Sequence, residues 1–356
     1  MKKEWYEALA EKELRRAKNG SIAIGVVTKE GRFYDGQFHD DPNETDIKDM
    51  IFEIGSTTKT FTSLLLAKMV LEETISLDDP IVKYKPKYKK ALVNNGEEIT
   101  FRHLSTHLSR LPREDSKVLR KRMKQDADAK HNAFKYYTNE DLDCFFTDFQ
   151  LNKEIGKKWG YSNLGVGLLG NVLSEILGES YETAISKHIL TPFGMKDTFA
   201  TVKGENLYRY TTSYNGKGER IPQIEIPATP GAGILKSTLH DMLTYLEYQM
   251  GMKETDLRDA ISLTHQIHGD TTFKKAKMGL GWFIEEKDWC NEPIIHHGGT
   301  TLGFHTYCGF LKEKGIGIVI FSTIQLKLIR LLKIALNLED AVNENIANAV
   351  FKELIR

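Results

Sequence analysis

Residues 55–72 read Gly-Ser-Thr-Thr-Lys-Thr-Phe-Thr-Ser-Leu-Leu-Leu-Ala-Lys-Met-Val-Leu-Glu. The apolar residues of this stretch recur at the spacing of one helix face, namely Phe61, Leu64, Leu65 and Met69. The pattern predicts a helix from Ser56 to about Glu72. A phosphate-binding loop is excluded, because Glu53 and Thr58 stand where that motif needs glycine.

Ser56 and Lys59 are three residues apart, so a helix places both side chains on one face within hydrogen-bonding reach. A serine hydroxyl is a poor nucleophile without a base beside it. A lysine amine can be that base only when burial or a nearby cation lowers its pKa. The pair therefore indicates either an activated nucleophile or, more simply, a helix cap next to a surface lysine.

A second segment with candidate site residues reads Trp-Gly-Tyr-Ser-Asn-Leu-Gly over 159–165. Tyr161 and Asn163 are two apart, and in an extended segment they would face one cavity. A phenol near an ammonium group can accept a proton, and an amide can hold both a lysine and a substrate carbonyl. The alternative is a buried loop tyrosine whose hydroxyl has a structural partner.

The third segment, Ile-Ile-His-His-Gly-Gly-Thr over 294–300, joins an apolar run to two glycines. Gly298 and Gly299 would let a ligand backbone approach as it would an edge strand, and His297 would supply a hydrogen-bond donor or a group that titrates near physiological pH. We expect no metal at His296 and His297, because neighbours on a strand point to opposite faces. Two surface histidines in a turn are the simpler alternative.

Around these segments the chain changes character twice. Residues 3–18 predict an amphipathic helix, and residues 21–39 predict a hairpin. The middle holds short helical patterns, while residues 303–323 predict a second hairpin and residues 338–355 a closing helix. We predict an α+β fold in which residues 1–80 plus 235–356 form an α/β lobe around an antiparallel sheet, and residues 81–234 form a mainly helical lobe. The default place for a site is the cleft between the lobes.

One stretch, from Arg113 to Lys130, is dense in charge, with seven Lys or Arg and four Asp or Glu. It fits a charge-laced helix, a solvated loop or a lid. We expect a solvated face without chemistry of its own.

Composition limits the function classes. Lys plus Arg equals Asp plus Glu at 49 each, so nothing in the charge favours nucleic acid as a partner. No apolar run suits a signal peptide or a membrane-spanning helix. The three cysteines, Cys144, Cys290 and Cys308, lack the number and spacing of a disulfide framework or a thiolate zinc site. These features favour the cytoplasm as the compartment.

Together, Ser56-x-x-Lys59, Tyr161-x-Asn163 and His297-x-Gly299 resemble, in order and spacing, the motifs of the serine β-lactamase and penicillin-binding protein superfamily. The chain is most similar to its class C-like branch, which contains β-lactamases, D-alanyl-D-alanine carboxypeptidases, D-aminopeptidases and esterases. The likeness extends over about residues 20–325. It implies a helical lobe inserted into an α/β lobe.

The resemblance also implies roles. Ser56 would be the acylated nucleophile, Lys59 its activating partner and Tyr161 the general base and later acid. Asn163 would orient Lys59 and the substrate amide, and His297 would stand where many relatives carry lysine.

The resemblance implies a serine hydrolase without cofactor or metal that cleaves an ester or amide, with a small ester, a D-amino-acid amide or a short peptide as substrate. Two departures reshape this expectation. His297-Gly298-Gly299 replaces Lys-Thr-Gly, which argues against efficient β-lactam hydrolysis, and Arg110 replaces the usual glycine. The alternative is a penicillin-binding or sensing module that is acylated without efficient turnover.

Overall fold

The computed structural model describes residues 6–16, 19–39, 45–125, 129, 132–215, 217–324 and 341–356. The starts of the helices predicted over 3–18 and 338–355, and part of the charged stretch, therefore lie outside the described residues. No helix of the described part is long and apolar enough to cross a membrane.

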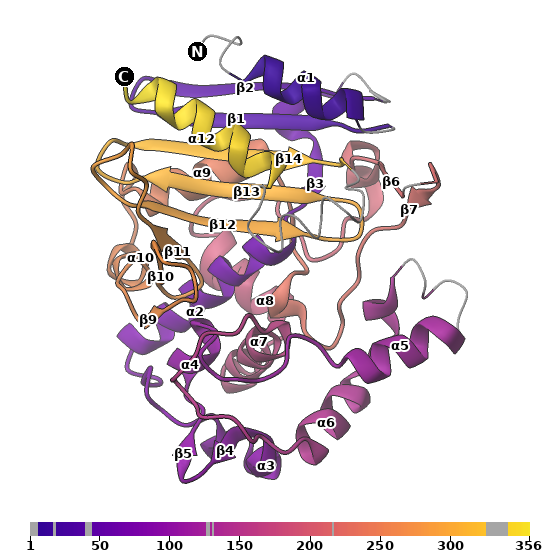
Figure 1. Ribbon diagram of the computed structural model, residues 1–356, viewed down its shortest axis with the longest axis vertical. Helices are drawn as coiled ribbons and strands as arrows, with labels where there is room; N and C mark the ends of the chain where they lie inside the picture. The colour runs from indigo at the N-terminus through magenta and orange to yellow at the C-terminus, as the bar shows by residue number, and fades with distance from the viewer. Residues whose placement is uncertain are drawn as a thin grey trace.

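An antiparallel sheet forms the upper part of the molecule, and among the described residues its strands follow the order β2-β1-β14-β13-β12-β11-β10-β9 (Figure 1). Its strands are β1 (Ile22–Thr28), β2 (Gly31–Gln37), β9 (Gly269–Asp270), β10 (Ala276–Met278), β11 (Phe283–Glu285), β12 (Ile294–Thr300), β13 (His305–Leu311) and β14 (Ile316–Ser322). The first and last strands in sequence, β1 and β14, are neighbours, so chain segments far apart in sequence share one sheet. Both predicted hairpins, at 21–39 and 303–323, are confirmed.

Alternating side chains of the central strands pack into two hydrophobic cores, one on each face of the sheet. On β1, Ile22 and Ile24 belong to the core on one face, while Ala23 packs into the core on the other. On β14, Ile318 and Val319 divide in the same way, and the whole strand is buried. This period of two is why both strands read as continuous apolar runs: each is covered on both faces.

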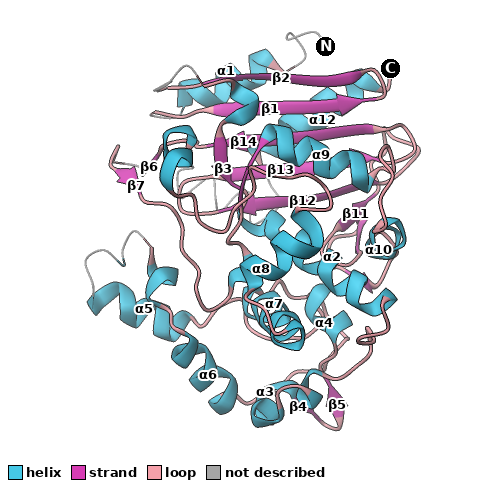
Figure 2. Ribbon diagram, turned by 180° about the vertical axis from the view of Figure 1, so that it is seen from behind, coloured by secondary structure: helices cyan, strands magenta, loops and turns pink. Residues whose placement is uncertain are grey.

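Helices cover the two faces. α1 (Glu7–Arg16) and α12 (Val342–Leu354) lie on the face nearer the viewer in Figure 1, and α9 (Leu239–Gln249) lies on the other face, seen in front in Figure 2. α12 contacts β13 and β14, and α9 contacts β1 and β14. Both termini lie at this end of the molecule (Figure 1).

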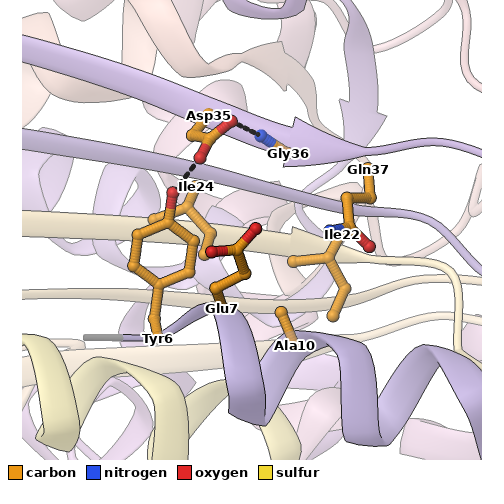
Figure 3. Close-up of a pocket in the computed structure, with 8 residues that line it drawn as sticks. All are labelled: Tyr6, Glu7, Ala10, Ile22, Ile24, Asp35, Gly36 and Gln37. Atoms are coloured by element: carbon orange, nitrogen blue, oxygen red, sulfur yellow. Dashed lines mark hydrogen bonds between the residues drawn. The ribbon is translucent and has the colours of Figure 1, made fainter. Parts of the chain in front are cut away.

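Contacts at its first turn hold α1 on the first hairpin (Figure 3). The Tyr6 hydroxyl donates a hydrogen bond to the Asp35 carboxylate on β2, and Ala10 packs beside Ile22 of β1. Burial, followed by the hydrogen bond to Asp35, raises the pKa of Tyr6, so this phenol stays protonated and keeps donating.

The rest of the described chain is mainly helical, and most of its helices lie below the sheet in Figure 1. Its helices are α2 (Thr58–Leu71), α3 (Lys89–Leu92), α4 (Phe101–Ser105), α5 (Ser116–Gln125), α6 (Asn139–Asp148), α7 (Asn163–Leu177), α8 (Tyr181–Ile185) and α10 (Arg258–Thr264). Short strand pairs complete it, namely β3 (Ile51–Glu53) with β8 (Lys236–Thr238), β4 (Val93–Asn94) with β5 (Glu97–Glu98), and β6 (Ser213–Tyr214) with β7 (Arg220–Ile221). Of these, β3, β6 and β7 lie at the height of the sheet in Figure 1. The predicted α+β class, an antiparallel sheet with helices, is confirmed.

Candidate active site

Ser56 lies in a 3-10 turn, η3 (Gly55–Thr57), that leads directly into α2. Every residue from 51 to 67 except Ser56 is buried, so the hydroxyl is the one point at which this segment meets solvent. The α-helix begins at Thr58, two residues later than predicted, and no side chain caps it. The serine therefore does not serve as a helix cap, and its hydroxyl remains available for chemistry.

The Lys59 ammonium group donates hydrogen bonds to Ser56 Oγ at 3.0 Å and to the Ala232 carbonyl at 2.6 Å. Lys59 is completely buried, at 0% exposure. Burial lowers its pKa from 10.5 to about 7; the charge of Glu114 opposes this shift and that of Arg113 adds to it. About half of the Lys59 side chains are thus neutral at pH 7 and able to accept a proton.

Tyr161 lies over the same lysine, with the Lys59 nitrogen 4.9 Å from its ring centroid. Its ring also meets His107 at 4.3 Å between centroids, and the Arg113 guanidinium carbon lies 5.0 Å from its centroid. Burial raises the pKa of Tyr161 to about 12, while the Ser56 hydroxyl and the Arg113 charge act in the opposite direction. At neutral pH this phenol is a proton donor, which fits the later, acid part of the role that the resemblance implies and not its first part as general base.

Asn163 is the first residue of α7, whose N-cap, Ser162, accepts a hydrogen bond from the Gly165 N–H. Its side-chain amide nitrogen donates to the Glu114 carboxylate, and its buried Oδ1 has no hydrogen-bond partner in the described structure. The expectation that Asn163 orients Lys59 is therefore not met by a hydrogen bond here; Asn163 holds Glu114 instead.

Arg113 and Glu114 were missed by the sequence analysis, which expected the stretch from Arg113 to Lys130 to be a solvated face without chemistry. That expectation is wrong for these two residues, because both line the smaller cavity at Ser56 and Arg113 also lines the larger one. The backbone carbonyl of Arg113 accepts a hydrogen bond from the Asn163 N–H at 3.0 Å, which joins this loop to the start of α7. The helix that follows, α5, holds no buried residue.

His297 lies on β12 and is buried, and its ring centroid is 6.4 Å from that of Tyr161. Its Nδ1 lies 2.6 Å from the Gly298 carbonyl, so Nδ1 carries the proton and donates. Nε2 is then an acceptor, and it has no partner in the described structure. Burial, and secondly the charge of Lys59, lowers the pKa of His297 to about 3. The predicted titration near physiological pH is thus wrong: His297 is a neutral group.

His296, the next residue along β12, contacts the Glu285 carboxylate at 3.1 Å, away from Ser56 and its lysine. Among the described residues no three His, Cys, Asp or Glu side chains gather as a metal site would require.

The end of β12 packs tightly against the turn that carries Ser56. A Cβ added to Gly299 would lie 2.1 Å from the Ile54 carbonyl oxygen, so only glycine fits there. Gly55 has a φ of +50°, and a Cβ on it would lie 3.0 Å from the Thr300 backbone nitrogen. The backbone of the turn and that of the strand end are thereby held close together next to Ser56.

Two cavities open onto Ser56. The smaller, of about 310 Å³, has Glu114, Asn163 and backbone near Thr300 among its walls, together with apolar side chains: Phe134, Ile224, Ile226 and Leu302. The larger, of about 570 Å³, runs along β12 past Tyr161 and His297. Arg113 lines both.

Comparison with known sequences gives consistent relatives. Residues 7–332 match the family described as Beta-lactamase. The chain is 29% identical over 287 residues to the D-alanyl-D-alanine-carboxypeptidase/endopeptidase AmpH of Escherichia coli (strain K12), covering 77% of this chain and 71% of that protein. It is 25% identical over 333 residues to a beta-lactamase of Pseudomonas fluorescens, covering 85% and 87%.

Solved structures share the fold. A class C beta-lactamase superposes with a TM-score of 0.78 at 20% identity over 97% of this chain and 95% of that one. The beta-lactamase/D-alanine carboxypeptidase from Pseudomonas syringae gives a TM-score of 0.76 at 19% identity, covering 93% and 96%.

Proposed function

The chain belongs to the beta-lactamase family, and from that premise we propose that it is a serine hydrolase whose Ser56 forms an acyl-enzyme with an ester or amide substrate. The observation that carries the proposal is the 3.0 Å contact between Ser56 Oγ and a completely buried lysine whose pKa is lowered to about 7. A lysine in this state is matched to proton transfer near neutral pH.

In the first step, neutral Lys59 accepts the proton of Ser56 as Oγ attacks the substrate carbonyl carbon. Backbone N–H groups of Ser56 and of the strand end after Gly299 stabilise the negative charge on the carbonyl oxygen. Lys59 is positively charged after this step. Because burial disfavours the charged form, Lys59 readily gives the proton up again.

In the second step, the bond to the leaving group breaks and the leaving atom takes a proton from the Tyr161 hydroxyl. Charged Lys59 returns a proton to Tyr161, so the site is neutral again when the acyl-enzyme has formed. Water then attacks the ester, with Lys59 again as the base, and releases the acid and free Ser56. This gives Lys59 the base role and Tyr161 the donor role, because their pKa values of about 7 and about 12 favour that order.

The substrate class is small esters, D-amino-acid amides or short peptides. His297 supports this class over β-lactams that depend on a cation, because it is neutral where many relatives carry lysine. The two cavities, of about 310 and 570 Å³, leave room for groups on both sides of a scissile bond.

Replacement of the nucleophile tests the proposal. We expect Ser56→Ala to lower kcat/KM for p-nitrophenyl butyrate by about 10³-fold or more, because no other group can form the acyl-enzyme. Ser63→Ala is the matched control: Ser63 lies on α2, the helix that follows Ser56, is buried, and its hydroxyl lies 2.8 Å from that of Ser105. It should retain activity within about threefold in the folded protein. Equal activity of Ser56→Ala and wild type would refute the serine mechanism.

A further inference from the structure

In the smaller cavity beside Ser56, the carboxylate of Glu114 has no oppositely charged partner among the described residues. Its hydrogen bond comes from the neutral amide of Asn163, and in the described chain Lys59 and Arg113 act on it through charge without forming an ion pair. A half-buried carboxylate with a single neutral donor lacks part of the stabilisation that water or a cation would give.

The nearest cations do not form an ion pair with Glu114. The Arg113 guanidinium lies over the Tyr161 ring at 5.0 Å, and the Lys59 ammonium is bonded to Ser56 and to the Ala232 carbonyl. Both act on Glu114 only through longer-range attraction, which lowers its pKa, while burial, the larger effect, raises it.

A second acceptor stands beside Glu114 on the same wall. Asn163 Oδ1 is buried and without a partner, and its nitrogen is fixed by Glu114, so the amide cannot rotate to present a donor without losing that bond. The other charged group of this cavity, the Arg113 guanidinium, lies over the Tyr161 ring and forms no ion pair with Glu114 in the described structure. The two acceptors therefore define a place for a group that donates several hydrogen bonds.

The remaining wall limits the shape of that group. Phe134, Ile224 and Ile226 are apolar and line the same cavity. A ligand there must combine an apolar body with a polar donor directed at Glu114. A primary ammonium on a short carbon chain has these properties, since it carries a positive charge and three N–H donors.

We propose that the cavity lined by Glu114, Asn163 and the apolar side chains binds a primary ammonium group, so that the preferred substrates are esters or amides carrying a free amine near the scissile carbonyl. This inference rests on the proposed function, because it assigns the substrate class of the Ser56 site. Glu114 is then a residue that determines specificity.

Boronic acids test the inference without requiring turnover of any particular substrate. The boron atom accepts an electron pair from Ser56 Oγ, whose proton passes to Lys59, so affinity depends on the nucleophile and on the group attached to boron. Two matched pairs of inhibitors replace a methyl group by an ammonium group of similar size, at two different distances from boron. The pairs are isopropylboronic acid with 1-aminoethylboronic acid, and n-butylboronic acid with 3-aminopropylboronic acid. Inhibition of p-nitrophenyl butyrate hydrolysis gives the inhibition constants.

In the wild type we expect at least one amine to bind about tenfold more tightly than its hydrocarbon partner. In Glu114→Gln that ratio should fall to about one or below, since glutamine keeps the shape and removes the charge. Glu175→Gln is the matched control, because Glu175 is an exposed carboxylate paired with Lys85 outside the site, and it should keep the wild-type ratio. Using the ratio of two inhibitors cancels any general effect of a substitution on Ser56.

Two results would overturn the inference: hydrocarbons that bind the wild type as tightly as both amines, or an amine preference that survives in Glu114→Gln. Failure of the proposed function has a different signature. In that case Ser56→Ala would hydrolyse the ester as the wild type does, and none of the four boronic acids would inhibit.

Discussion

Two lysines of this protein are alike in burial and in the direction of their pKa shift but differ in their hydrogen-bond partners. Lys59 and Lys236 are both at 0% exposure, and burial lowers the pKa of Lys59 to about 7 and that of Lys236 to about 8. Lys236 donates only to main-chain carbonyls, of Ala200 at 2.8 Å and Ile224 at 2.7 Å. Lys59 divides its hydrogen bonds between a carbonyl and the hydroxyl of Ser56.

The difference teaches what converts a buried lysine into a base. Lys236 is opposite Glu53 in the pairing of β3 with β8, and Glu53 in turn accepts from the Tyr210 hydroxyl at 2.7 Å. This arrangement joins strands, and Lys236 donates to two main-chain carbonyls where Lys59 reaches a reactive hydroxyl. Lys59 has no strand partner and reaches a hydroxyl that faces two cavities. A lowered pKa is common to both, so access to a reactive partner is what distinguishes them.

Replacement of Lys59 should give the largest effect, and the effect should be on activity and not on stability. We expect Lys59→Met to lower kcat/KM for p-nitrophenyl butyrate by about 10³-fold, because methionine fills the space without a base. Stability should not fall. Burial disfavours the charged lysine in the folded state, a cost that begins below the ordinary lysine pKa and is complete below about pH 7. Relief of that cost offsets the loss of the hydrogen bond to the Ala232 carbonyl, so the melting temperature should stay about equal. A melting temperature several degrees lower, with activity retained, would contradict this assignment.

Replacement of Lys236 should give the opposite result. Lys236→Met leaves the carbonyls of Ala200 and Ile224 without donors and the buried Glu53 without its nearby cation. We expect the free energy of unfolding to fall by about 3 kcal/mol, measured by urea denaturation. The activity of the remaining folded protein should stay within a few fold. Loss of activity at unchanged stability would show that Lys236 belongs to the reaction.

Replacement of Tyr161 sharpens the division of roles around Lys59. As a proton donor to the leaving group, Tyr161 matters most when that group leaves poorly. We expect Tyr161→Phe to lower kcat/KM by about 100-fold for an amide or alkyl ester and by no more than about tenfold for a p-nitrophenyl ester. Equal losses on both substrates would instead assign Tyr161 a part in activating Ser56.

The same contrast separates what the sequence could predict from what it could not. Ser56, in the 3-10 turn, and Lys59, in the first turn of α2, are three residues apart, so local geometry was sufficient to pair them. The two hairpins followed from their own periodicity. Glu114 could not be placed, because it reaches the site only where its loop meets the start of α7 and bonds to Asn163. One available signal was position, since Arg113 and Glu114 directly follow Leu111-Pro112 and precede the charged helix.

The ionisation of the site was equally outside the reach of the sequence. His297 was expected to titrate near neutral pH, yet burial and Lys59 lower its pKa to about 3. Tyr161 was expected to act as a base, yet burial raises its pKa to about 12. Both differences arise from desolvation, which depends on the tertiary packing around a side chain and not on its neighbours in the chain.

The central claim is that Lys59, neutral above about pH 7, activates Ser56, and the pH dependence of Ser56 labelling tests it most directly. A fluorophosphonate forms a bond from phosphorus to Ser56 Oγ with loss of fluoride, and intact-protein mass gives the rate of adduct formation. Because the neutral amine is the active form, the rate should rise about tenfold per pH unit below pH 7 and level off above it, with a midpoint near 7. The adduct should be absent in Ser56→Ala, and the inflection should be absent in Lys59→Met. An adduct that persists in Ser56→Ala, or a midpoint near 7 that persists in Lys59→Met, would contradict the account.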